Sequence, residues 1–166
     1  LKEMKVLHEK WVRASLQDFD PARQRDDELY ATYIEDWMRY ADIAHWNSWT
    51  ASVLSFGQPK LSVSHEEQLN SLSEWILSRI WPRRYPQLEE AFDNFLFVVQ
   101  DFLRVFHQHS ERKEDVYWTI AFYKERLVDQ ETYDRLLKVY NYHVDLVQDL
   151  MLELTRAANY ICDQIR

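Results

Sequence analysis

Glycine is nearly absent from this sequence of 166 residues, which contains a single one, Gly57. Average proteins contain roughly 7% glycine. Phosphate-binding loops, tight hairpins and nucleophile elbows need residues that tolerate a positive φ, and glycine is the usual choice. Its scarcity therefore argues against dinucleotide-binding, P-loop and hydrolase folds. It favours long helices joined by simple turns.

Cysteine and long hydrophobic runs are also scarce. The lone Cys162 cannot form a disulfide within the chain, which points to an intracellular setting. The longest uninterrupted apolar run, residues 95–99, is far shorter than the ~20 residues that a membrane span needs. The first ten residues lack the apolar core of a signal peptide. We expect a cytoplasmic protein with no membrane partner, and its start at Leu1 leaves open that it is part of a larger protein.

Basic charge is in the minority. The chain has 28 acidic and 20 basic residues, a net charge of -8, and 46% of its residues are hydrophobic. This content is too apolar for a disordered chain, and the negative charge does not suit a general nucleic-acid binder. We expect no DNA partner.

Metal-ligand patterns are missing as well. No glutamate stands three residues before a histidine, as di-iron helical bundles require. The six histidines include no two that are separated by three or four positions, and no cysteine cluster could hold zinc. We expect no metal and no cofactor.

The end of the sequence predicts one long helix, from about residue 130 to 166, with Asp129 as its N-cap. Its apolar positions alternate spacings of four and three, which is typical of an apolar helix seam. They are Tyr133, Leu137, Tyr140, Val144, Val147, Met151, Leu154, Ala158, Ile161 and Ile165.

A second long helix is predicted over about residues 20–56. Aspartate suits the N-cap and proline the first helical position, as in Asp20-Pro21, and Gly57 provides a stop. The expected seam is Tyr30, Tyr33, Trp37, Tyr40, Ala44, Asn47, Ala51 and Leu54.

Shorter helices complete the expected fold. A capping box at residues 64–67 opens one that runs to about Trp81, Pro86 opens another, and residues 1–17 form a further one through Met4, Leu7, Trp11 and Val12. The apolar face after Pro86 is Leu88, Phe92, Phe95, Leu96, Val99, Phe102, Leu103 and Phe106. Residues 116–123 have strand-like composition but no visible partner strand, so we interpret them as helical or irregular.

The predicted fold class is therefore all-α. Each amphipathic helix has to bury its apolar stripe, and helix-on-helix packing does so without a sheet. We expect an antiparallel bundle of four main helices, two of them long (about 20–56 and 130–166), with one or two short additional helices, in a single domain over residues 1–166.

The stretch RVFHQH, residues 104–109, holds the strongest candidates for catalysis: Arg104, His107 and His109. An ordinary helix end explains them all. Arg104 lies three residues after Asp101 and can pair with it on the surface, and histidines near a helix C-terminus are favoured by the helix dipole when they are protonated.

The spacing of Arg104 and His109 also resembles the R-x4-6-H signature of HEPN domains, a family of dimeric helical proteins that includes metal-independent ribonucleases. The resemblance covers six residues of 166, and Val105 stands where the family usually has a polar residue. It implies that Arg104 stabilises phosphate charge and that His109 is the general acid or base, with His107 as a second candidate. RNA is a partner only under this alternative.

Candidate interaction residues lie elsewhere. Trp46, Trp49 and Val53 form an apolar stripe opposite the small-residue face Ala44, Ser48, Ala51 and Ser52. A helix with two such faces is either sandwiched within the bundle or exposes a tryptophan stripe to a partner. If it is exposed, the stripe is the best candidate for a contact surface.

Charged residues provide two further candidates. Asp145, Asp149 and Glu153 form an acidic row that is either a solvated face or a docking ridge for a basic partner. Arg83 and Arg84 lie between Trp81 and Pro86, in a loop that either contacts an anionic partner or only links two helices.

These patterns favour a non-enzymatic helical interaction or regulatory domain, which self-associates, as a dimer for example, or binds a protein partner. The alternatives are a HEPN-like endoribonuclease that uses Arg104 and His109, and a helical bundle that binds a small ligand.

Overall fold

The structure is a computed structural model that describes residues 2–17, 20–124 and 127–166. Its described residues fall into two compact units, residues 1–36 and 37–166, and each unit is treated by itself. Most of them are helical, which confirms the all-α class in its coarser form, but a three-stranded sheet is also present and a four-helix bundle is not confirmed. The single domain over residues 1–166 stays a prediction.

Unit 1 contains α1 (Lys2–Gln17) and the greater part of α2 (Pro21–Tyr40). Asp20 caps the start of α2, because its carboxylate accepts a hydrogen bond of 3.0 Å from the backbone N–H of Ala22. Pro21 follows at the first helical position, as the sequence predicts.

The prediction of one continuous helix over about residues 20–56 is wrong, because α2 ends at Tyr40. Asp42 adopts a left-handed backbone (φ 50°), and the chain continues through η1 (Ile43–His45), α3 (Trp46–Val53) and η2 (Ser55–Gly57). Aspartate is one of the few residues that tolerate this conformation, and its carboxylate lies 2.8 Å from His45 Nδ1. The break shifts the helix phase, so that Ala44, Asn47 and Ala51 of the expected seam are exposed.

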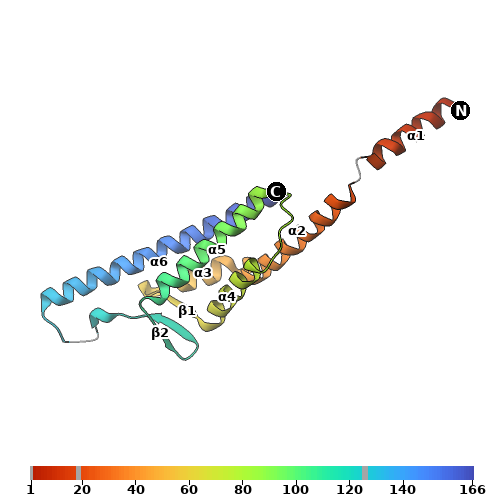
Figure 1. Ribbon diagram of the computed structural model, residues 1–166. Helices are drawn as coiled ribbons and strands as arrows, with labels where there is room; N and C mark the ends of the chain where they lie inside the picture. Colours follow the sequence, from red (N-terminus) through yellow and green to blue (C-terminus); the bar gives the residue numbers. More distant parts are fainter. Residues whose placement is uncertain (1, 18–19, 125–126) are drawn as a thin grey trace. The chain divides into compact units, whose positions relative to one another are not determined.

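The core of unit 2 lies along α5 (Pro86–His107) and α6 (Gln130–Ile165), which run side by side in opposite directions (Figure 1). Both helices begin where the sequence predicts. Pro86 is in the first turn of α5, and the Asp129 side chain, the N-cap of α6, accepts a hydrogen bond from the N–H of Thr132 at 3.0 Å. All eight predicted core residues of α5 are buried. In α6 the predicted seam is buried from Tyr140 to Ile161.

The sheet corrects the interpretation of residues 116–123. β3 (Val116–Thr119) forms a hairpin with β2 (Ser110–Lys113), and its other edge pairs antiparallel with β1 (Lys60–Ser62). The strand order is β1-β3-β2. Only η3 (Phe122–Lys124), at the end of the stretch, is helical. Neither partner strand was predicted. The β2 strand has four polar residues, and β1 has three residues about 55 positions away, so both are too short to carry a periodic signal.

The α4 helix (Val63–Leu77) starts and ends earlier than expected. Its N-cap is Ser62, whose hydroxyl accepts from the backbone N–H of His65 at 3.1 Å, and not Ser64. The His65 ring lies in the place of the expected glutamate, with Nδ1 2.7 Å from the Ser62 hydroxyl. Thus a serine-histidine pair closes the first turn.

This cap makes a testable distinction between two neighbouring serines. We expect Ser62→Ala to lower the free energy of unfolding by about 1 kcal/mol, because the N–H of His65 loses its acceptor. The matched variant Ser64→Ala removes an exposed hydroxyl within the helix and should change stability by less than about 0.5 kcal/mol. Urea denaturation of both variants measures the difference, and equal effects would contradict the assigned cap.

Candidate functional site

Arg104 is engaged at the surface of α5. Its guanidinium donates to Asp101 Oδ1 at 3.2 Å, and the two side chains are 63% and 57% exposed. The predicted i, i+3 pair is therefore confirmed. An exposed pair of this kind contributes a few tenths of a kcal/mol and leaves the arginine on the outer face of the helix.

His107 is the last residue of α5 and connects it to two other elements. Its Nδ1 lies 3.0 Å from the hydroxyl of Ser110, and its Nε2 lies 3.5 Å from Glu66 Oε1 on α4. The ring meets Tyr117 of β3 edge to face, with 4.9 Å between centroids. The contact with Glu66 becomes an ion pair when the imidazole is protonated. These contacts hold the hairpin and α4 against the end of α5.

His109 faces a second histidine on α6, and this histidine pair was not predicted. The rings of His109 and His143 are perpendicular, with centroids 4.8 Å apart, and Phe122 lies 5.3 Å from His109. His143 is 3% exposed, and its Nε2 has no hydrogen-bond partner among the described residues. Burial, with a smaller contribution from the charge of His109, lowers the pKa of His143 to about 4. His143 is therefore neutral at pH 7.

Tyrosines line the same part of α6. Tyr140 donates a hydrogen bond of 3.4 Å to the carbonyl of Gly57 and lies 5.0 Å from the Tyr123 ring. Burial, and secondarily Tyr123, raises the pKa of the Tyr140 hydroxyl. Tyr133 packs edge to face on Tyr123 at 5.7 Å. The histidine pair thus adjoins an aromatic layer that joins η3 to the first half of α6.

The residues of RVFHQH have different partners. Arg104 contacts Asp101 and His109 contacts His143, so the two residues of the HEPN resemblance are each engaged elsewhere within the chain. No group of three histidine, cysteine or acidic side chains suited to a metal ion occurs among the described residues. The meeting of Arg104 and His109 from two protomers stays a prediction.

The predicted tryptophan stripe lies in the core. Trp46, Trp49 and Val53 are 9%, 4% and 1% exposed. The indole N–H of Trp46 donates to the Thr155 hydroxyl on α6 at 3.0 Å, and Trp49 stacks on His65 with centroids 5.3 Å apart. The structure thus corresponds to the alternative in which this helix is packed inside the fold and buries its tryptophan stripe. These three residues do not form an exposed surface.

The charged candidates are spread over the surface of unit 2. Asp145, Asp149 and Glu153 are exposed on α6, where Glu153 pairs with Arg156. Arg83 has a left-handed backbone (φ 58°), and its N–H donates to Glu89 Oε1 at 2.8 Å. Arg84 is half-buried. The role of the acidic row and of these two arginines in binding stays a prediction.

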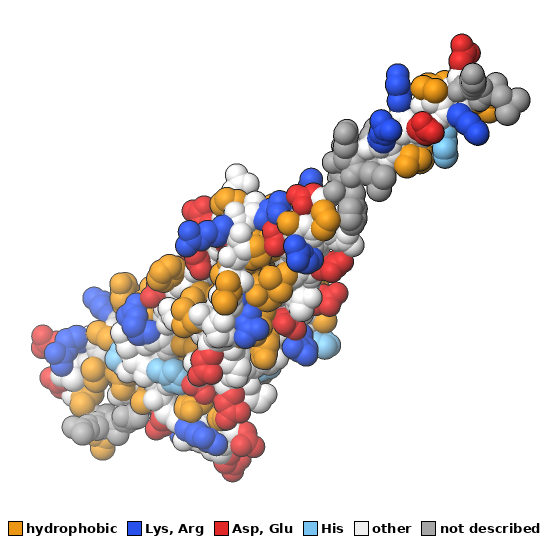
Figure 2. Space-filling model, turned by 45° about the vertical axis from the view of Figure 1, so that its right-hand side comes forward, with side chains coloured by type: hydrophobic (Ala, Val, Ile, Leu, Met, Phe, Trp, Pro, Cys, Tyr) orange, Lys and Arg blue, Asp and Glu red, His pale blue; other side chains and the backbone are white. Residues whose placement is uncertain are grey.

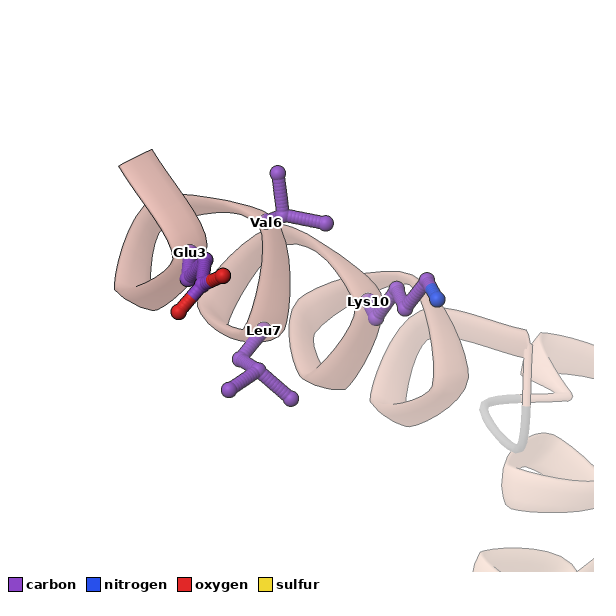
Figure 3. Close-up of a pocket in the computed structure, with 4 residues that line it drawn as sticks. All are labelled: Glu3, Val6, Leu7 and Lys10. Atoms are coloured by element: carbon purple, nitrogen blue, oxygen red, sulfur yellow. The ribbon is translucent and has the colours of Figure 1, made fainter. Parts of the chain in front are cut away.

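Among the described residues, those of α1 include an exposed apolar helix face. Met4, Leu7 and Trp11 are 76%, 66% and 69% exposed, and we call these three residues the α1 seam. Figure 2 shows hydrophobic side chains among the charged ones of α1. A shallow pocket beside the seam is lined by Glu3, Val6, Leu7 and Lys10. Figure 3 shows Val6 and Leu7 pointing to different sides of the helix, so Val6 lies outside the seam.

Sequence reasoning identified the apolar residues of α1 but assigned them to a core. The spacing of three and four shows that they share a face, but it cannot show whether another element covers that face. Their exposure is visible only in the structure.

Comparisons of the chain with protein-family models, with curated proteins and with solved structures found no match. Among the described residues, no helix combines the length and the apolar character that a membrane crossing requires.

Proposed function

We propose that this chain is a non-enzymatic helical interaction domain that binds a partner helix through the α1 seam. The observation that carries the proposal is the exposure of Met4, Leu7 and Trp11, which is at least 66% for each. Removing one such side chain from water stabilises a complex by about 1.5–3 kcal/mol. A contact that covers all three would therefore offset much of the entropy that is lost on association.

The length of α1 supports the same conclusion. Isolated helices shorter than about 12–15 residues are marginal in water, and α1, with 16 residues, is only slightly longer. Most helices of this length are stabilised by the packing of their apolar face. A partner that covers the α1 seam would provide that packing.

The shape of the seam indicates what kind of partner fits. Met4, Leu7 and Trp11 follow spacings of three and four, the repeat at which two helices interlock their side chains. Lys5 and Glu9 lie away from this stripe on a helical wheel, so the apolar face is narrow. A narrow stripe suits another helix better than a broad flat surface.

A photo-cross-linking experiment tests the proposal. We would replace Leu7 with the photoreactive residue p-benzoyl-phenylalanine, and Glu9 in the control, and irradiate each protein alone and in an extract of its own cells. We expect the residue at position 7 to give a discrete intermolecular adduct, at least about five times more abundant than the adduct from position 9.

Equal labelling at both positions, or no intermolecular adduct at position 7, would contradict binding through the seam. A normal helical circular dichroism spectrum of both variants shows that the substitutions leave the fold intact.

A further inference from the structure

We infer that the partner of the α1 seam is a second copy of this chain, and that two α1 helices pair in parallel and in register. The inference rests on the proposed function and specifies the partner. It is motivated by the exposure of the seam and by the polar residues that flank it.

The seam fits the heptad repeat of a two-stranded coiled coil. If Met4 occupies position a, then Leu7 occupies d and Trp11 the next a. All three are large and exposed. In a parallel, in-register pair each of them packs against its own counterpart, so three consecutive apolar layers form.

The flanking charges are compatible with this arrangement. Glu3 and Lys10 then occupy g positions, and His8 occupies an e position. In a parallel pair, a g residue faces the e residue five positions later on the partner helix. Glu3 therefore meets His8 of the second copy, while Lys10 faces an uncharged residue. No two like charges meet across the parallel interface.

Antiparallel pairing is less compatible with the same residues. If Leu7 faces Trp11 of the second copy, the two Lys10 side chains come together next to the twofold axis and repel. If Met4 faces Leu7 instead, Glu3 meets Lys10 favourably, but Trp11 lies outside the shared layers. Only the parallel register covers the whole seam without a repulsive pair.

The surface charge away from the seam does not oppose the pairing. Lys5, Glu9 and Arg13 take positions b, f and c, which point away from the partner helix. The two copies can therefore approach through α1 although the chain carries a net charge of -8. Salt screens the repulsion that remains between the two chains.

Cysteine cross-linking distinguishes the registers. In a Cys162→Ser background, we expect Leu7→Cys to give a disulfide-linked dimer on mild oxidation, at least about ten times more than Val6→Cys. Val6 provides a matched control because it is the adjacent residue, it is 51% exposed and it points to a different side of α1 (Figure 3). Sedimentation equilibrium of the unmodified protein should show a dimer fraction that increases over about 10–500 µM, typical of a short coiled coil.

The alternative outcomes each overturn the inference. A mixture of Leu7→Cys and Trp11→Cys, or of Met4→Cys and Leu7→Cys, that cross-links better than Leu7→Cys alone would show antiparallel pairing. An unmodified protein that stays monomeric at 500 µM would exclude a second copy as the partner.

Photo-cross-linking at position 7 then distinguishes a failure of the second-copy inference from a failure of the proposed function. An adduct of position 7 with a different protein would leave the proposed function standing and reject only the second copy. A cross-link between position 7 and another part of the same molecule, in a product that keeps the mass of the monomer, would show that the seam docks within its own chain, and both proposals would fail.

Discussion

Between pH 7 and pH 4, the free energy of unfolding should fall by about 2–3 kcal/mol because of His143 alone. The folded state lowers the pKa of this imidazole from 6.5 to about 4. In this interval the unfolded chain therefore binds a proton that the folded chain rejects. Stability is retained above pH 6.5, decreases as the pH falls, and the full penalty is reached below about pH 4.

The physical cause is burial without a partner. His143 is 3% exposed, and its Nε2 has no hydrogen-bond partner among the described residues to stabilise an added proton. The neighbouring ring of His109, which would repel the new charge, adds to the effect. Protonation should therefore loosen the contact between α6 and the start of β2.

Urea denaturation between pH 4 and pH 7.5 measures this dependence. We expect His143→Leu to be markedly less sensitive to pH than the unmodified protein, because the buried imidazole is gone. The control Tyr142→Phe changes the adjacent residue of α6, which is 70% exposed, and should retain the original slope. If His143→Leu loses stability as steeply as the parent, another group is responsible.

The parts of the fold that could be predicted are those with local and uninterrupted signals. The seam of α6 repeats without a miss from Tyr140 to Ile161, and Pro86 marks the start of α5. Such helices can be located from spacing and capping residues alone.

The break at Asp42 could not be predicted for the opposite reason. No glycine or proline lies at this break, and the apolar residues on its two sides, Trp37 and Trp46, suit one continuous helix as well as two. With the left-handed turn, both tryptophans pack on Phe95 of α5. A local pattern does not contain this tertiary interaction.

The candidate sites were predictable only in part. The pairing of Arg104 with Asp101 depends on a spacing of three within one helix, which the sequence shows directly. The pairing of His109 with His143 joins two elements 34 positions apart, and it depends on the sheet that turns the chain after α5. His143 is next to the seam residue Val144, and this position at the edge of the α6 seam is the one available signal.

A larger loss of stability is expected from the centre of unit 2. Phe95→Ala should lower the free energy of unfolding by about 3–5 kcal/mol, the usual cost of removing a fully buried aromatic ring and leaving a cavity. Phe95 is 0% exposed, and its ring lies 5.6 Å from Trp37 and 6.4 Å from Trp46, centroid to centroid. For a chain of this size the melting temperature should fall by about 10 °C.

Phe97 provides a matched control on the same helix. It is only two residues away but 66% exposed, so Phe97→Ala should change the stability by less than about 0.5 kcal/mol. Thermal and urea denaturation of the two variants measure the difference. If the two variants lose equal stability, the assigned core face of α5 is wrong.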